Sequence, residues 1–356
     1  LARPLGGIIM AHFGDLLGRK RMFTLSIFLM GVPTLAMGLL PTYAQIGIWA
    51  PILLLLLRIV QGAAIGGEVP GAWVFVSEHV PAKHVGFACG TLTAGLTAGI
   101  LLGSLTATLI NSLFTPQEVL DWAWRLPFLL GGVFGLCAVY LRRMLQETPV
   151  FAEMQQRHAL AAELPLKTVL REHRGAIVLS MLLTWVLSAA IVVVILMTPT
   201  LLQTLYGFDA ATALKANSLA IVFLSLGCVA AGAIVDRVGA GRVLLLGGLL
   251  LGVTSWTFYS SLKLHPEWLF PLYALTGLFV GTIGAVPFVM ANAFPPVVRF
   301  SGLSFSYNVA YAIFGGLTPL VVSLLIKADP LGPAYYVAAL CGLSVLIGLY
   351  LRGRGR

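Results

Sequence analysis

The sequence predicts an all-α, polytopic membrane protein. Of its 356 residues, 59% are hydrophobic and only 10% are charged, whereas soluble domains carry about 25% charged residues. The hydrophobic residues gather in repeated runs of about 20, the length of a membrane-spanning helix. A porin-type barrel would instead show short alternating segments, so the pattern excludes that architecture.

Eleven spans follow from the apolar runs, taken in order along the chain. The first is too short to cross a bilayer, and we expect the outer part of that helix and one further helix to precede it. The predicted spans are Leu1–Phe13, Met22–Leu40, Ile52–Val76, Val85–Leu109, Leu126–Leu141, Ala176–Leu201, Ala213–Val235, Val243–Leu262, Leu269–Ala293, Gly302–Ile326 and Ala334–Leu351.

The basic residues predict the orientation of these spans, because cytoplasmic loops are enriched in lysine and arginine. If the Arg19–Arg21 loop is cytoplasmic, sixteen of the 22 basic residues lie on that side. Only Lys215, Lys263 and Lys327 then fall in or near outer loops. The net charge of +9 is thus explained by membrane orientation and indicates no nucleic-acid partner. The C-terminus is expected in the cytoplasm.

An internal repeat divides the chain into two halves. The stretch Asp15 to Arg21 recurs 221 residues later as Asp236 to Arg242, each time between two spans in the same orientation. Parallel halves of six helices are a known transporter architecture, with the substrate near the midplane. We expect an N-terminal bundle at 1–145, a cytoplasmic linker at 146–174 and a C-terminal bundle at 175–356. With the missing first helix, the plan is six helices plus six.

Six motifs follow one another in register and cover nearly the whole chain. They are Ala2-Arg3-Pro4 with Gly6-Gly7; Gly14-Asp15 with Gly18-Arg19-Lys20; Arg58 and Gln61-Gly62 with Gly66-Gly67-Glu68; Trp124-Arg125 with Pro127-Phe128; Glu147-Thr148-Pro149 with Phe151; and Phe294-Pro295 with Val298-Arg299, Ser301-Gly302, Tyr307-Asn308, Gly315-Gly316 and Pro319. Together they resemble the major facilitator superfamily, and in detail its metabolite:proton symporter branch, whose members carry α-ketoglutarate, citrate, shikimate, or proline and betaine.

The resemblance implies a major facilitator fold and secondary transport of a small metabolite. The sequence departs from the family at two places. The first helix, which usually carries an acid, is absent, and Asn292 stands where an acid typically precedes the Phe-Pro pair. Transport is therefore more firmly implied than proton coupling.

Two charges in one apolar run indicate a polar site within the membrane. Arg58 and Glu68 lie ten residues apart, about 15 Å along a helix, and cannot pair directly if that helix is regular. Arg58, with Gln61 beside it, suits a substrate carboxylate, and Glu68 could bind and release the coupling proton. Pro70 would free the carbonyl of Gly66 as a further acceptor. The alternative is that both charges pair structurally with neighbouring helices.

Other polar residues in apolar spans are candidates for the substrate site. Arg3 is either a second anion contact or the structural partner of an acid on the preceding helix. In the second half, Asn217, Tyr307, Asn308 and Tyr311 place polar groups on otherwise apolar helices.

The repeated loop is the candidate gate. Asp15 and Gly18 in the first copy match Asp236 and Gly239 in the second, and Arg19 follows Gly18 in the first copy alone. Asp15 could accept bonds from the positive N-terminal end of the helix beginning near Gly302, close to Arg299, and Asp236 from the helix beginning near Val85. The superfamily resemblance implies these contacts and implies that they hold an outward-open state, whereas the sequence itself shows only the repeat. The alternative is a pair of solvated turns.

No catalytic constellation, nucleotide fingerprint or metal-ligand spacing is present in the sequence. We therefore predict no enzyme activity, cofactor or metal. The expected function is secondary transport of a small organic acid or zwitterion by alternating access with proton symport, by a monomer in a bacterial inner membrane. A uniporter or exchanger without proton coupling, and a non-transporting nutrient sensor, are the alternatives.

Overall fold

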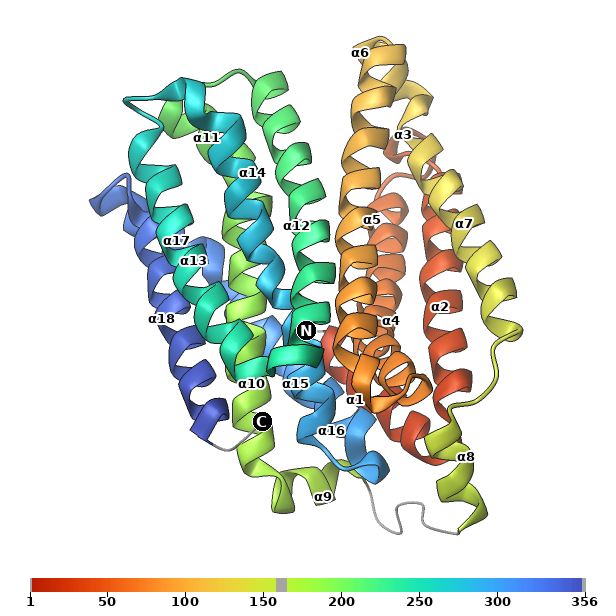
Figure 1. The fold of residues 1–356 in the computed structure, drawn as a ribbon. Helices are drawn as coiled ribbons and strands as arrows, with labels where there is room; N and C mark the ends of the chain where they lie inside the picture. The colour runs from red at the N-terminus through yellow and green to blue at the C-terminus, as the bar shows by residue number, and fades with distance from the viewer. Residues whose placement is uncertain (1, 158–164, 354–356) are drawn as a thin grey trace. The chain divides into compact units, whose positions relative to one another are not determined.

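A computed structural model describes residues 2–157 and 165–353 (Figure 1), and every regular element in these ranges is a helix. Ten helical stretches are long and apolar enough to cross a membrane. They match ten of the eleven predicted spans, and the remaining span is α1, of 16 residues. The predicted number and order of spans are confirmed.

The helices run longer than the apolar runs that predict them, because polar residues extend their ends. The long stretches are α1 (Ala2–Leu17), α2 (Arg19–Leu39), α4 (Trp49–His79), α5 (Val85–Leu113), α7 (Arg125–Arg143), α10 (Arg174–Ala190), α11 (Thr198–Tyr206), α12 (Ala210–Val238), α13 (Ala240–Ser261), α14 (Leu269–Val280), α15 (Val286–Ala293), α16 (Arg299–Ala310), α17 (Gly316–Ala328) and α18 (Gly332–Gly353). Short helices α3 (Tyr43–Ile46), α6 (Pro116–Glu118), α8 (Pro149–Gln156) and α9 (Pro165–Glu172) lie in the connections.

Three of the long stretches change helical pitch partway along. Residues Ile191–Met197 join α10 to α11 as a π-helix, and Tyr311–Gly315 join α16 to α17 in the same way. A 3₁₀ turn at Gly281–Ala285 joins α14 to α15. Such interruptions are common at functional sites of membrane helices, because they redirect backbone groups within the span.

The chain forms two compact units, each of which takes segments from distant parts of the sequence. Unit 1 contains 1–79, 102–174 and 294–308, and unit 2 contains 80–101, 175–293 and 309–356. The segment 294–308 therefore folds with the first third of the chain, and 80–101 with the last. Each unit is described by itself below.

Close approach at glycine determines the packing of unit 1. Helix α2 lies between α4 and α7, and α1 packs along α4 (Figure 1). A Cβ added at Gly135 would lie 2.8 Å from the Cα of Gly31, so α2 and α7 touch through their backbones there. Arg125 on α7 donates to the carbonyls of Gly38 and Leu40 at 3.0 and 2.6 Å, which satisfies the C-terminal end of α2.

Unit 2 also packs through close contacts between glycines. Helices α13 and α18 meet where Gly241 faces Gly348, and a Cβ on either would lie 2.8 or 2.7 Å from the other's carbonyl oxygen. In lipid the hydrophobic effect contributes little to the association of helices. Small residues stabilise the contact instead, because they let the two backbones pack closely.

The internal repeat appears as two turns of the same kind, one in each unit. Gly18 (φ 116°) precedes α2 and Gly239 (φ 87°) precedes α13. Both φ values lie where only glycine is unstrained. The repeated glycine thus allows the sharp turn between two consecutive spans.

Candidate functional site

A polar site forms in unit 1 where α1, α4 and α16 meet. The three helices approach closely because glycines line the contact. A Cβ added at Gly66 would collide with the carbonyl oxygen of Arg3 and lie 2.6 Å from the backbone nitrogen of Gly7. One added at Gly6 would collide with the backbone of Ala63. This packing brings Arg3 alongside the middle of α4.

Asn308 is the centre of this site. Its side chain is fully buried, and its Nδ2 donates to the carbonyl oxygen of Gly66 at 2.7 Å and to that of Ser304 at 2.8 Å. The carbonyl of Gly66 has no helical donor at Pro70, as predicted from the sequence, because proline lacks the N–H that would bind the residue four before it. The acceptor is used by α16, and Ser304 Oγ also donates to it at 3.3 Å.

Arg3 and Tyr307 complete the site. Arg3 Nε donates to Asn308 Oδ1 at 2.8 Å, and its guanidinium lies 5.0 Å from the ring centre of Tyr307. Tyr307 in turn packs edge-on against Trp73 at 5.0 Å. Among the described residues, the buried indole nitrogen of Trp73 has no hydrogen-bond partner. A buried donor without a partner is costly, so this position suits a bound acceptor such as a substrate oxygen or a water.

Arg58 and Gln61 form a second polar group nearer the N-terminal end of α4. Arg58 is exposed, and its NH1 donates to Gln61 Oε1 at 3.3 Å. Gln61 Nε2 donates to Thr34 Oγ1 on α2 at 2.6 Å, which orients the amide. The long bond from Arg58 leaves most of its planar fork available to a carboxylate.

Glu68 is paired with a neighbouring helix, which is the structural alternative considered for it. Its carboxylate accepts hydrogen bonds from both terminal nitrogens of Arg142 on α7, at 2.9 and 2.5 Å. It also accepts one from the hydroxyl of Ser26 on α2. The guanidinium of Arg142 also lies 3.6 Å from the ring centre of Phe23. The arginine holds the carboxylate at both of its oxygens, so the pair ties α4 to α7.

A buried charge cluster occupies the junction of α1, α2, α4 and α16. Asp15 lies 3.1 Å from Arg19, Arg19 lies 3.3 Å from Glu78, and Glu78 lies 3.1 Å from Arg299. The side chains of Asp15 and Glu78 are completely buried, and that of Arg19 is 1% exposed. Two acids and two arginines balance in charge. Thr148 adds a hydroxyl bond of 2.8 Å to Glu78.

The predicted contact of Asp15 with a helix N-terminus is present. Its Oδ2 accepts from the backbone nitrogen of Ser301 at 2.9 Å, in the first turn of α16. Arg19 also donates to the carbonyl of Pro296 at 2.7 Å, just before that helix. We call Asp15, Arg19, Glu78 and Arg299, with this turn, latch 1. Its gating role stays a prediction.

The second copy of the repeat makes the matching contact in unit 2. Asp236 accepts from the backbone nitrogens of Gly86 at 2.7 Å and Phe87 at 2.8 Å, at the start of α5. The close packing of Gly86 and Gly90 against Gly232 sets this distance. We call the contact between Asp236 and these two amides latch 2.

Asn217 and Tyr311 both lie in unit 2 but in different settings. Asn217 is buried, and its Oδ1 accepts a hydrogen bond from the hydroxyl of Tyr273 at 2.5 Å. The same hydroxyl lies 2.6 Å from the carbonyl oxygen of Val194. Tyr311 is half-buried and begins the π-helix Tyr311–Gly315. The structure therefore gives Asn217 a structural bond and leaves Tyr311 at a bend.

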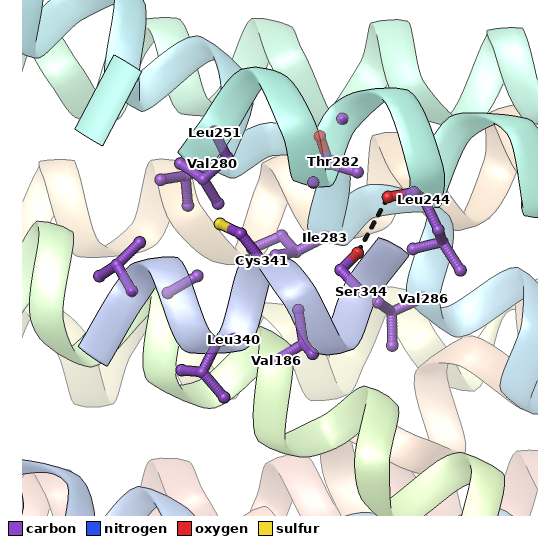
Figure 2. Close-up of a pocket in the computed structure, with 14 residues that line it drawn as sticks. Val186, Leu244, Leu251, Val280, Thr282, Ile283, Val286, Leu340, Cys341 and Ser344 are labelled. Carbon is purple, nitrogen blue, oxygen red and sulfur yellow. Dashed lines mark hydrogen bonds between the residues drawn. The ribbon is translucent and has the colours of Figure 1, made fainter. Parts of the chain in front are cut away.

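A well-enclosed cavity in unit 2 is a packing defect and not a metabolite site (Figure 2). It offers about 20 Å³ to the centre of a water molecule, enough for about one water. Its walls are almost entirely apolar, with Val186, Leu251 and Leu340 among them. The hydroxyl of Ser344 donates a hydrogen bond to the carbonyl of Leu244 at 3.0 Å. No group there would recognise a charged solute.

Three residues of these sites are not among the candidates predicted from the sequence. Glu78 lies two residues past the predicted end of its span at Val76, and Arg142 lies one residue past Leu141. Trp73 lies inside a predicted span, where an indole gives no signal of a polar role. The signal for Glu78 was available, because an acid near the end of a span faces the basic Arg19 and Arg299 loops.

Apolar helices that enclose ion pairs and a polar centre are typical of a polytopic membrane transporter. A family model described as Major Facilitator Superfamily matches residues 1–319. The chain belongs to this superfamily, and it is a multi-pass secondary transporter.

Named relatives share the whole length of the chain. A putative proline/betaine transporter of Staphylococcus aureus (strain COL) is 32% identical over 99% of this chain and 76% of its own length. A citrate-proton symporter of Klebsiella pneumoniae is 30% identical over 99% of this chain and 80% of its own. The solved structure of the proton:xylose symporter XylE with a bromo-deoxyglucose has a TM-score of 0.78 at 16% identity, over 99% of this chain and 84% of that one. It establishes the fold alone.

Proposed function

We propose that this protein carries a small organic acid or zwitterion together with a proton, by alternating access. The observation that carries the proposal is the site around Asn308, where the half-buried Arg3 and the amide of Asn308 lie near the indole nitrogen of Trp73, which has no hydrogen-bond partner among the described residues. Relatives named as proline/betaine and citrate-proton transporters support the substrate class. The protein would act as a monomer in a bacterial inner membrane, with its C-terminus in the cytoplasm.

Arginine determines the substrate class in this proposal. Arg3 and Arg58 would hold a carboxylate, because their planar forks match its two oxygens. Gln61, Tyr307 and Asn308 would orient it from unit 1. For Asn217 and Tyr311, which belong to unit 2, a role in substrate binding stays a prediction from the sequence.

The pair of Glu68 and Arg142 would couple the proton. Arg142 occupies both carboxylate oxygens of Glu68, so a proton could reach them only after Arg142 has moved away. A change of state that separates α4 from α7 at this point would therefore bind or release one proton. Latches 1 and 2 would hold the state closed to the cytoplasm, and Gly18 and Gly239 would supply the turns that position them.

The direct test is uptake of radiolabelled substrates into proteoliposomes. A panel of small carboxylates and betaines is supplied with an inward proton gradient, and accumulation is followed with and without an uncoupler. We expect one member of the panel to accumulate and the uncoupler to abolish the accumulation. Accumulation that survives the uncoupler would mean an exchanger or uniporter, and binding without flux would mean a sensor.

Arg58→Lys is expected to weaken carboxylate binding about tenfold or more, because an ammonium cannot offer two parallel donors to one carboxylate. Equilibrium binding of the accumulated substrate to purified protein measures the effect. Arg157→Lys is the matched control, since Arg157 is 74% exposed and pairs with Glu153 of helix α8. Equal affinity in both variants would remove Arg58 from the substrate site.

Glu68→Gln is expected to abolish proton-driven accumulation and to leave substrate counterflow largely intact. The amide cannot exchange a proton, but it keeps the size of the side chain and an acceptor for Arg142. The ratio of counterflow to proton-driven uptake, measured on the same preparation, isolates coupling from folding. An equal loss of both activities would make the pair of Glu68 and Arg142 purely structural.

A further inference from the structure

We propose that a groove between α1 and the linker helix α9 binds the headgroup of an anionic phospholipid. The groove has a volume of about 700 Å³ and lies wholly within unit 1. Its α1 side is apolar, with Ile9 57% and Phe13 43% exposed. Its α9 side adds Leu166 and Leu170. This inference concerns a site separate from the substrate, proton and latch residues above.

Helix α9 is held firmly enough to form a wall. Its Val169 is completely buried and Pro165 is buried, and the helix packs on α1 and on the turn Pro296–Val298. The opposite side of the helix is exposed, so α9 is strongly amphipathic. A helix of this kind at the end of a membrane span is suited to the bilayer interface.

Among the described residues, the charged side chains that line the groove are all basic. Lys167 and Arg171 are four residues apart on α9 and so share a face, and Arg174 follows at the start of α10. Arg174 is tied to the end of α9 by a 3.1 Å bond from its Nε to the carbonyl of Leu170. The acid of the same helix, Glu172, is not among the described residues that line the groove. Three cations beside an apolar groove complement a phosphate carrying acyl chains.

His12 supplies a polar group at the depth where a headgroup meets its chains. It lines the groove, and among the described residues its buried Nδ1 has no hydrogen-bond partner. It lies five residues before the end of α1, about 7.5 Å from it. A phosphate or glycerol oxygen in the groove would satisfy this nitrogen, as no apolar occupant would. The exposed apolar face of α1 at Ile9 and Phe13 complements acyl chains and not a soluble partner.

The test is photolabelling of the full chain in nanodiscs. Phosphatidylglycerol and phosphatidylcholine with the same photoreactive acyl chain are compared, and labelled peptides are identified by mass spectrometry. We expect phosphatidylglycerol to label the peptides that contain 8–13 and 166–171 at least about fivefold more than phosphatidylcholine does. Equal labelling by the two lipids would overturn the proposal without any variant having to fold.

Variants then assign the effect to the groove. Lys167→Gln with Arg171→Gln should lower phosphatidylglycerol labelling of those peptides by about fivefold or more. Lys83→Gln with Arg237→Gln removes the same two charge types from exposed positions outside the groove and should leave the labelling unchanged. Unchanged labelling in the first variant, or competition by glycerol 3-phosphate that shows a soluble phosphate to be the ligand, would refute a lipid site.

Discussion

Glu78→Gln is expected to lower the free energy of unfolding of the purified protein by about 3–5 kcal/mol. The side chain of Glu78 is completely buried and faces both Arg19 and Arg299, at 3.3 and 3.1 Å. Removing one partner from a buried ion pair leaves charge without compensation, and here two arginines lose their shared carboxylate. The denaturation midpoint in detergent measures the change.

The control is another glutamate with an arginine partner. Glu153 is 59% exposed and lies 2.6 Å from Arg157, which is 74% exposed. Water and salt screen such a pair, so Glu153→Gln should cost no more than about 1 kcal/mol. If the two variants shift the midpoint equally, the charge cluster of latch 1 does not stabilise unit 1.

Gly66→Ala is expected to destabilise the protein by about 1–3 kcal/mol, at the upper end of that range. The added Cβ would collide with the carbonyl oxygen of Arg3 and would lie 2.6 Å from the nitrogen of Gly7. Both are backbone atoms, so α1 and α4 must move apart. The movement would also stretch the 2.7 Å bond from Asn308 to the Gly66 carbonyl. The fraction of monodisperse protein left after graded heating reports the loss.

Gly342→Ala in α18 is the matched control. No atom of the described residues lies within 4 Å of a Cβ built there, so the added methyl group is expected to be neutral or to stabilise the helix by up to about 1 kcal/mol. Similar losses in the two variants would mean that the effect of Gly66 comes from the loss of a glycine and not from the helix contact.

The sequence predicts the spans well because hydrophobicity over about 20 residues is a local property. The partners of Asp15 and Asp236 were predicted through the resemblance to the superfamily, because the sequence itself shows only the repeat; the structure has both contacts, at Ser301 and at Gly86. Both contacts depend on the backbone amides of a helix N-terminus and need no knowledge of side-chain direction.

The pairs made by side chains could not be predicted in the same way. Whether Glu68 faces Arg142 depends on the rotation of α4 and α7 about their axes, which an almost uniformly apolar helix does not encode. The ends of helices caused the second failure. Because α4 continues to His79 and α7 to Arg143, Glu78 and Arg142 point into the helix packing and not into a loop.

The contacts of latch 1 can form only late in the synthesis of the chain. Asp15 is made 286 residues before Ser301, and Glu78 221 residues before Arg299. At about 5–20 residues per second, the nascent N-terminal helices would wait roughly 10–60 seconds in the membrane for these partners. During that interval the acids lack the charge and amides that α16 supplies later. A chain that ends before Phe294 should therefore be recognised as unfinished by membrane quality control, even though all the helices of the first bundle are present.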